Sequence, residues 1–594
     1  MDYYDFYTGK EFEAHKYLGA HLENGGAVFR VFAPAANKIT VMTDTNDWNE
    51  IEMDRVYNGQ FFEKFVEGVK EGTQYKYKIY KNNGNVTEHC DPYGFGMQLR
   101  PDWASIVRDS DSFTFTDDAW MKKRTDCKNR PLNIYEVHMG SFMREDGKAW
   151  YNYEEVAQRL IPYVKENGYN YIEMLPISEH PCDESWGYQN TGFFAPTSRY
   201  GTMNQLKKFI DMCHSQDIGV ILDYVPVHFA VDDYALANFD GTHLYEYPHD
   251  SVGVSEWGSC NFIHSRGEVR SFLQSAANYW ISDYHFDGLR MDAISRIIYW
   301  QGQENRGVNY QAVEFIRDLN GYLKQNNPAI ILTAEDSTNF KDVTKSVSDG
   351  GLGFDYKWDM GWMNDTLDFF QTAPEHRSEK YHNLTFSMMY YYNEKYLLPL
   401  SHDEVVHGKK TIIDKMYGEY EEKFSQARAL YMYMYAHPGK KLNFMGNEIA
   451  QFREWDEKRQ QDWDILSYPK HEAFQCYMKQ LNNLYMDDKV FSELDFVEDG
   501  FKWIDCHMEE HCIYCFERSS GDERVLFVFN FMNHSYENYH VQVENCGNLD
   551  MVLNSNTREF GGDDERRPEE ICTGEKGEFS FDLQPYSALM FKIR

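Results

Sequence analysis

Phe286-Asp287-Gly288-Leu289-Arg290-Met291-Asp292 is a short, mostly apolar segment that ends on a carboxylate. Its length and composition predict a buried β-strand. Side chains alternate along a strand, so Arg290 and Asp292 share one face while Leu289 and Met291 share the other. The apolar pair can pack against helices, and the face with the two charges can line the interior of a barrel.

Seven other segments of this kind occur between residues 119 and 485, and amphipathic stretches such as Tyr153–Asn167 and Val269–Tyr284 alternate with them. This alternation favours a parallel sheet, and eight strands predict a (β/α)8 TIM-like barrel of the α/β class. The region exceeds the roughly 250 residues of a plain barrel, so we expect insertions, above all between Pro226 and His285, over the barrel mouth. The other predicted strands are Asn133–His138, Tyr171–Ile177, Gly219–Val225, Ala329–Glu335, Phe354–Asp359, Tyr396–His402 and Lys441–Glu448.

Both ends of the chain carry the short runs and turn residues of antiparallel sheets. We predict an N-terminal β-sandwich over residues 1–118, the barrel over 119–485, and a C-terminal antiparallel β-sandwich over 486–594. Strand candidates in the first sandwich are Ala27–Phe32, Lys38–Met42, Gln60–Phe65 and Tyr75–Tyr80. Those in the last are Phe501–Asp505, Arg524–Asn530, Tyr539–Val543 and Ala588–Ile593.

The chain is strongly acidic: its 594 residues hold 59 Lys and Arg against 95 Asp and Glu, a formal net charge of −36. Such a surface repels phosphate backbones and anionic membranes, so we expect neither nucleic acid nor a membrane as partner. No apolar run approaches the roughly 18 residues of a membrane-spanning helix. Met1-Asp2-Tyr3-Tyr4-Asp5 lacks the basic and then apolar pattern of a signal peptide. We therefore expect a soluble, cytoplasmic protein.

The cysteines do not form a disulfide framework, because there are 11 of them, an odd number, scattered through a long chain. The nearest approach to a metal motif is Cys512-Ile513-Tyr514-Cys515, with Cys506 and His507 upstream. Zinc needs a second ligand pair at a suitable spacing, and this segment alternates like a strand. No glycine-rich phosphate loop follows a strand. We expect no metal site and no cofactor.

Four predicted barrel strands end on or beside a carboxylate, at Asp223, Asp292, Glu335 and Asp403. Reactive residues of such barrels lie at the carboxyl ends of the strands. Any one of these residues alone is better explained as a helix N-cap. Four together, with an arginine and two histidines nearby, indicate a functional cluster, because like charges are costly to bury unless they are paired or protonated. Two carboxyl groups about 5–5.5 Å apart across a sugar bond would support a retaining displacement.

These four strand ends, in this order, resemble the signature regions of the α-amylase superfamily of glycoside hydrolases and transglycosylases. Longer segments narrow the resemblance to the 1,4-α-glucan (glycogen) branching enzymes, and it extends over nearly the whole chain. It includes a carbohydrate-binding-like N-terminal sandwich with Thr45-Asn-Asp-Trp-Asn49. Several long motifs in the right order are a more specific signal than one short pattern. They are Ser185–Gly201 (SWGYQNTGFFAPTSRYG), Phe239–Glu246 (FDGTHLYE), Gly350–Asp365 (GGLGFDYKWDMGWMND) and Leu400–Lys409 (LSHDEVVHGK).

The resemblance implies catalytic roles for the matched residues. Asp292 would be the nucleophile that forms a β-glycosyl ester, and Arg290 would keep it ionised. Glu335 would be the general acid and then the base. Asp403 would bind sugar hydroxyls and stabilise the oxocarbenium-like state.

Four residues besides Arg290 and the three carboxylates would complete the substrate site under the same resemblance. Tyr188 would stack beneath the sugar, Asp223 would anchor the local network, and His228 and His402 would donate hydrogen bonds to the sugar. The substrate would be an α-glucan, glycogen or amylose. The sequence leaves the oligomeric state open, with a monomer as one possibility.

The signature regions leave the acceptor open, because hydrolases share them. A branching enzyme transfers the cut chain to a 6-hydroxyl and so forms an α-1,6 branch, whereas an α-glucan hydrolase transfers it to water. Only the longer motifs favour transfer. A third alternative, a non-catalytic glucan-binding homologue, would be expected to lack one of the three catalytic carboxylates, and all three are present.

Several aromatic segments have two interpretations. Trp48 either stacks on a glucan or belongs to the core of its sandwich. Trp186, Trp358, Trp362 and Trp455 lie in the motif-bearing segments, where partial burial is the alternative to a role in binding. The run Ala429–Tyr435 is better explained as a packed barrel helix than as a cofactor site. The departures from the family pattern around 452–463 are expected near the rim that binds the glucan.

Overall fold

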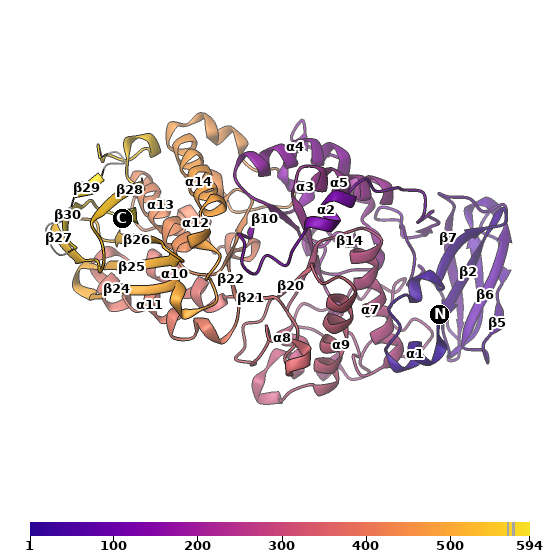
Figure 1. The fold of residues 1–594 in the computed structure, drawn as a ribbon. Helices are drawn as coiled ribbons and strands as arrows, with labels where there is room; N and C mark the ends of the chain where they lie inside the picture. The colour runs from indigo at the N-terminus through magenta and orange to yellow at the C-terminus, as the bar shows by residue number, and fades with distance from the viewer. Residues whose placement is uncertain (567–569, 573–576) are drawn as a thin grey trace. The chain divides into compact units, whose positions relative to one another are not determined.

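The computed structural model describes residues 1–566, 570–572 and 577–594. The described chain divides into two compact units. The first contains Met1–Thr125, His138–Ile161 and Glu173–Phe354, and the second contains Asp126–Val137, Pro162–Ile172 and Asp355–Arg594. Helices and strands are labelled as in Figure 1.

Eight strands, hydrogen-bonded in chain order, form a closed barrel, which confirms the predicted fold. Every residue in these strands is buried, as expected for parallel strands between a packed interior and surrounding helices. Each of the eight predicted segments overlaps one of these strands, with ends that differ by a few residues. They are β10 (Asn133–Val137), β13 (Tyr171–Met174), β16 (Gly219–Tyr224), β19 (Gly288–Met291), β20 (Ile331–Ala334), β21 (Tyr356–Trp358), β22 (Tyr396–Leu400) and β23 (Lys440–Phe444).

Seven long helices belong to the barrel region. The two predicted helices are present as α4 (Tyr153–Glu166) and α7 (Gly267–Ser282). The Ala429–Tyr435 run lies in α13 and is buried throughout, which confirms that it is a packed helix. The other long helices are α5 (Met203–Ser215), α9 (Tyr310–Asn326), α10 (Met360–Gln371), α13 (Tyr420–Ala436) and α14 (Pro469–Asp487).

Strands β19 and β20 approach each other closely at Gly288. A Cβ atom added there would lie 2.3 Å from the carbonyl oxygen of Ile331, far inside van der Waals contact. Glycine is the one residue without a Cβ, so it permits this spacing. The register places Arg290 beside Thr333, two residues before Glu335.

The N-terminal sandwich is formed by two antiparallel sheets, and β7 alternates strictly between buried and half-buried residues. Helix α1 (Tyr3–Thr8) lies beside the barrel helix α7, and the Ser271 hydroxyl donates to the Phe6 carbonyl (Figure 1). The sheets have the orders β1-β2-β6-β5 (Gly19–Glu23, Gly26–Phe32, Phe61–Glu67, Asp54–Val56) and β4-β3-β7-β8 (Ile51–Glu52, Ala36–Thr43, Gln74–Lys81, Val86–His89), with β9 (Ser105–Ile106) paired to β7.

The connection between β16 and α7 contains the insertion predicted after Pro226, and we call it the excursion. It includes the short strand pair β17 (His228–Phe229) and β18 (Cys260–Asn261). It also bonds to the N-terminal sandwich, which the sequence did not predict. The Lys81 ammonium lies 2.7 Å from the Asn238 carbonyl, and the Cys90 amide donates to the Tyr234 carbonyl at 2.8 Å. The excursion therefore packs against the sandwich.

The C-terminal region is an antiparallel sandwich, as predicted. A six-stranded sheet and the pair β27-β30 enclose a core of apolar side chains that includes Leu526, Val541 and Phe581. Its strands are β24 (Phe501–Met508), β25 (Ile513–Ser520), β26 (Glu523–Asn530), β27 (Tyr536–Gln542), β28 (Asn548–Asn554), β29 (Glu570–Cys572), β30 (Glu578–Leu583) and β31 (Ser587–Ile593). Within the described ranges, no helix is long and apolar enough to cross a membrane.

A buried ionic cluster holds the amino ends of β16 and β19. The His214 ring lies between two carboxylates, with Nδ1 2.7 Å from Asp117 and Nε2 2.9 Å from Asp287. The same Asp287 oxygen, Oδ2, also accepts the Val220 amide of β16 at 2.8 Å. Burial alone would lower the pKa of His214, but the two carboxylates outweigh it and raise this pKa to about 9.

We predict that His214 makes stability depend on pH. The folded pKa lies above the unfolded value of about 6.5, so the stabilisation is complete below about pH 6.5 and is lost as the pH rises through about 9. In the wild type this loss amounts to roughly 3 kcal/mol. His214→Gln should have a lower Tm at pH 6 and a flatter Tm profile between pH 6 and 10. The exposed His249→Gln is the control, and a Tm difference from wild type that is equal at both pH values would contradict the prediction.

Candidate active site

The first unit brings four of the eight predicted site residues together at the ends of β16, β19 and β20, and a fifth, Tyr188, is hydrogen-bonded to them. In the register of the parallel strands, Asp223 is the partner of Arg290. Asp292 directly follows β19 and Glu335 directly follows β20. The predicted convergence of carboxylates from different strands is therefore present in this unit.

The guanidinium of Arg290 is the centre of this group. Its Nη1 donates to Asp223 and, at 3.0 Å, to Asp292 Oδ1. Its Nη2 donates to Glu335 Oε2 at 2.9 Å. One cation thus bonds to the carboxylates at the ends of three strands, and it fixes where each of them lies.

Burial separates these carboxylates into an inner one and two outer ones. The side chains of Arg290 and Asp223 are 0% and 1% exposed, whereas those of Asp292 and Glu335 are 13% and 20% exposed. Burial opposes the charge on Arg290, but attraction to Asp223, Glu335 and Asp292 outweighs it and raises the arginine pKa further above its usual range. The arginine therefore remains a cation, and the two outer carboxylates are accessible to a ligand.

A strained turn joins the two outer carboxylates. Ala293 has a positive φ of 46°, which is unfavourable for a residue with a side chain. In this conformation its amide donates to Glu335 Oε2 at 2.8 Å, and the next amide, of Ile294, donates to the Glu335 carbonyl at 3.1 Å. The backbone after Asp292 thus orients Glu335.

Tyr188 belongs to the same network through its hydroxyl group, which donates to Asp223 and accepts from Arg290 Nη1 at 3.3 Å. His228 lies in β17, and its ring is 5.3 Å from that of Trp257. Burial lowers the pKa of His228 to about 4, so the ring is neutral at pH 7. Its Nδ1 has no hydrogen-bonding partner among the described residues.

His402 and Asp403 lie in the second unit. The strand predicted over Tyr396–His402 ends earlier than expected, because β22 stops at Leu400. Both residues therefore lie in a 3-10 turn, His402–Val405. His402 Nε2 is 3.5 Å from Asp403 Oδ1. The side chain of Asp403 is 41% exposed and that of His402 only 1%, so within this unit the carboxylate is accessible while the histidine is packed.

Glu136, in β10, binds the predicted site residue His402, a contact that the sequence analysis missed. It is fully buried, and its two oxygens accept the His402 amide at 2.9 Å and the His402 Nδ1 at 2.6 Å. Because a carboxylate only accepts, Nδ1 carries a proton and the ring is held in one orientation. A charged residue inside an apolar strand was the available signal.

The tryptophans divide between surface and core. Trp48 is 37% exposed, with the Lys76 ammonium 5.4 Å from its ring centre, so the alternative that it belongs to the core is wrong. The side chains of Trp358, Trp362 and Trp455 are at most 6% exposed. They are therefore more deeply buried than the partial burial that the sequence analysis gave as the alternative to a binding role.

The described residues contain no group of three or more His, Cys, Asp or Glu side chains that could hold a metal ion. In the carboxylate cluster the guanidinium already occupies the centre. Cys512 and Cys515, the nearest approach to a zinc motif, are buried free thiols.

Three family profiles match parts of the chain. They are carbohydrate-binding module 48 (isoamylase N-terminal domain) over residues 17–94, the alpha amylase catalytic domain over 136–240, and the alpha amylase C-terminal all-beta domain over 503–594. Among solved structures, a pullulanase from Anoxybacillus sp. LM18-11 aligns with a TM-score of 0.77 over 100% of this chain and 89% of its own, at 15% identity. The type I pullulanase of Bacillus subtilis str. 168 aligns with a TM-score of 0.76 over 98% and 86%, at 18% identity. These likenesses concern the fold.

Curated relatives are much more similar in sequence. The 1,4-alpha-glucan branching enzyme GlgB of Geobacillus stearothermophilus is 43% identical over 99% of this chain and 94% of the relative. The chain belongs to this family of branching enzymes. Other members are GlgB of Bacillus caldolyticus, 44% identical over 95% of this chain and 86% of the relative, and GlgB of Bacillus subtilis (strain 168), 42% identical over 94% and 91%.

We predict that Glu136 is a positioning residue for the family's reaction. Glu136→Gln keeps the shape of the side chain but replaces one acceptor oxygen by a donor that faces a donor of His402. We expect kcat to fall about 10- to 100-fold, with a smaller change in KM, because His402 loses its fixed orientation. Glu517→Gln, a buried glutamate of the C-terminal sandwich, is the matched control. Equal kcat values for both variants would show that Glu136 has only a structural role.

Proposed function

We propose that this protein is a 1,4-α-glucan branching enzyme that cuts an α-1,4 bond and rejoins the cut segment through an α-1,6 bond. The observation that carries the proposal is the pairing of two accessible carboxylates, Asp292 and Glu335, with one buried arginine. Membership of the branching-enzyme family over nearly the whole chain supports this choice of reaction.

In the first half of the proposed reaction, Asp292 attacks the anomeric carbon of the bound glucan. The bond from that carbon to the 4-oxygen breaks, and Glu335 in its acid form gives its proton to the leaving oxygen. The product is a β-glycosyl ester on Asp292. Arg290 supports this step because its charge keeps the Asp292 carboxylate ionised and nucleophilic.

In the second half, the 6-hydroxyl of another glucan chain attacks the same carbon. Glu335, now a carboxylate, accepts the hydroxyl proton, and the ester bond breaks to release Asp292. Two inversions at the anomeric carbon retain its configuration, so the new bond is an α-1,6 branch.

The other site residues bind and orient the sugar in this proposal. Asp403 stabilises the oxocarbenium-like state, and His402 donates a hydrogen bond to the sugar. The Tyr188 ring stacks beneath the sugar while its hydroxyl is held by Asp223. His228, neutral at pH 7, contributes a hydrogen bond from its buried ring.

We further propose cytoplasmic glycogen and amylose as substrates. The ten cysteines whose side chains are described are all free, as is usual in a reducing compartment. We also propose domain boundaries after residues 118 and 485. The carbohydrate-binding profile (17–94) and the C-terminal profile (503–594) fall within the outer two regions.

We predict that the protein converts unbranched amylose into a branched product. The experiment counts new α-1,6 linkages and new reducing ends after incubation. Branch points should increase with few additional reducing ends, because the cut chain goes to a hydroxyl instead of water. An increase in reducing ends without branches would replace the proposal by hydrolysis, and unchanged amylose that still binds would favour a glucan-binding protein.

We predict that Asp292→Ala abolishes turnover, because no other group would form the ester. The loss should be at least about 10⁴-fold, as for removal of a covalent nucleophile. Asp292 is partly exposed, so the variant should fold, which circular dichroism and the Tm can check. Appreciable residual activity in the folded variant would assign the nucleophile to another residue.

A further inference from the structure

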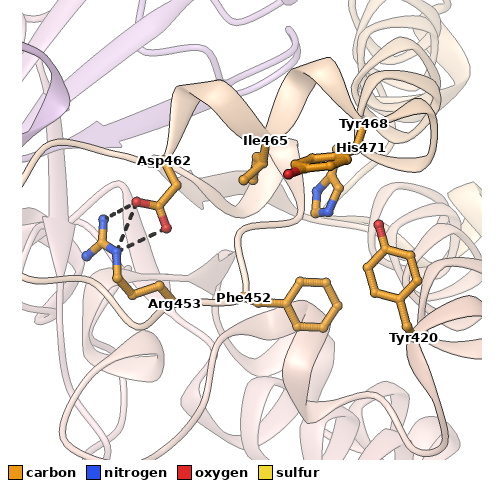
Figure 2. A pocket seen from close by; sticks show the side chains of 7 residues that line it. All are labelled: Tyr420, Phe452, Arg453, Asp462, Ile465, Tyr468 and His471. Atoms are coloured by element: carbon orange, nitrogen blue, oxygen red, sulfur yellow. Dashed lines mark hydrogen bonds and ion pairs between the residues drawn. The ribbon is translucent and has the colours of Figure 1, made fainter.

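The loop after β23 is held by an ion pair. It covers residues 450–462, between the short 3-10 helices η12 (Asn447–Ile449) and η13 (Trp463–Ser467), and its residues, all of them described, form neither helix nor strand. Arg453 Nε lies 3.0 Å from both oxygens of Asp462, and Arg453 Nη2 lies 2.9 Å from Oδ1 (Figure 2). A forked contact of this kind fixes direction as well as distance. We call this segment the 450–462 loop.

Further bonds close the 450–462 loop on itself around the ion pair. Arg453 Nη2 donates to the Gln460 carbonyl at 2.8 Å, and Nη1 donates to the Glu454 carbonyl at 3.1 Å. The buried Gln451 bonds to both partners, since its Oε1 accepts the Asp462 amide at 2.8 Å and its Nε2 donates to the Arg453 carbonyl at 2.9 Å. The start of the loop is therefore tied to its end, and the backbone of Glu454 is bonded directly to the guanidinium.

Two residues of the loop bind the 3-10 turn after β22 and the backbone that follows it. The carboxylate of Glu454 accepts the amides of Gly408 and Lys410 at 3.0 and 2.6 Å. The Trp455 amide donates to the Val405 carbonyl at 3.0 Å. The 450–462 loop thus fixes the last residue of the turn and the segment directly after it.

The segment held by Glu454 is bonded in turn to Asp403. Lys409 lies between the two amides that Glu454 accepts, and its ammonium donates to the Asp403 carbonyl at 2.8 Å. The same ammonium lies 3.2 Å from Glu404 Oε1. A displacement of this segment would therefore move the backbone of Asp403.

The indole of Trp455 packs against the predicted site residue His402. The two ring centres are 6.1 Å apart with planes inclined by 84°, and the indole also lies 5.1 Å from the ring of Phe444 in β23. Because Glu136 fixes the Nδ1 of the same histidine, His402 is held both by a hydrogen bond and by ring packing. Only the second of these contacts depends on the 450–462 loop.

The ion pair itself is partly exposed, with 22% of the Arg453 side chain and 27% of the Asp462 side chain accessible. Exposed ion pairs add little to the free energy of unfolding, so the loss of this one should displace the loop without unfolding the protein. We propose that Arg453 is a positioning residue for the branching reaction. Its pairing with Asp462 keeps Glu454 and Trp455 where they fix the turn after β22.

The proposal rests on the proposed function for the roles of His402 and Asp403. The products of the wild type test the proposed function, because they show whether branches or reducing ends are formed. The variants test Arg453, since branching and hydrolysis share the cleavage step and either product reports its rate. The two proposals can therefore fail separately.

The experiment measures the initial rate of product formation over a range of amylose concentrations. Arg453→Met keeps the unbranched stem and should lower kcat about 10-fold while KM changes less than about 2-fold, because a displaced Asp403 stabilises the transition state less. Arg453→Lys keeps the charge without the fork and should lower kcat about 3-fold.

Arg524→Met is the matched control. Arg524 forms a similar two-bond pair with Glu517 in the C-terminal sandwich, and its side chain is 23% exposed. This variant should have the kcat of the wild type. Circular dichroism and the Tm establish that each variant is folded. If Arg453→Met does not fold, Arg453→Lys takes its place, and a kcat equal to that of the wild type would then overturn the proposal.

A double variant distinguishes positioning from a general loss of stability. Glu454→Gln places a donor against the amides of Gly408 and Lys410 and should itself lower kcat. Adding Arg453→Met to Glu454→Gln should lower kcat less than about 2-fold further, because both changes act on the same turn. Losses that multiply in full would overturn the proposal. So would a raised KM at unchanged kcat, which would make Arg453 a contact for the glucan.

Discussion

The guanidinium of Arg290 is the interaction on which the candidate active site depends. Asp223, Asp292 and Glu335 lie at the ends of three separate strands, and their like charges would repel one another without a cation between them. One buried cation makes their approach favourable. The amino end of its strand is held in place by Gly288 against Ile331 and by Asp287 against His214.

The fold could be predicted from the sequence because most of the buried barrel strands lie in short, largely apolar segments that alternate with amphipathic stretches. The carboxylates could be predicted because Asp292 and Glu335 directly follow such strands, while Asp223 lies near the end of one and Asp403 in the turn after another. Strand ends were less certain: the segment predicted to reach His402 stops at Leu400, where a 3-10 turn takes over. His402 and Asp403 nevertheless lie beside the end of this strand, in the turn that follows it.

Contacts between distant residues could not be predicted in this way. Glu136 and His402 are separated by 266 positions, and neither local periodicity nor composition links them. The same holds for Lys81 and Asn238, which join the first sandwich to the excursion. Ala293 is a different case, because its left-handed backbone is stabilised by Glu335 from another strand, and alanine gives no local sign of a turn. In each case a partner far along the chain decides the local structure.

Gly288 has a consequence for how this protein can vary. The separation of β19 and β20 is set by backbone contact, so the distance from Arg290 to Glu335 does not depend on the choice of neighbouring core side chains. Apolar substitutions elsewhere in the barrel can therefore accumulate over evolution without disturbing that distance. Gly288 itself has no such freedom, since any side chain would push the two strands apart. Gly288 therefore restricts the spacing of these two strands even where the surrounding core side chains differ.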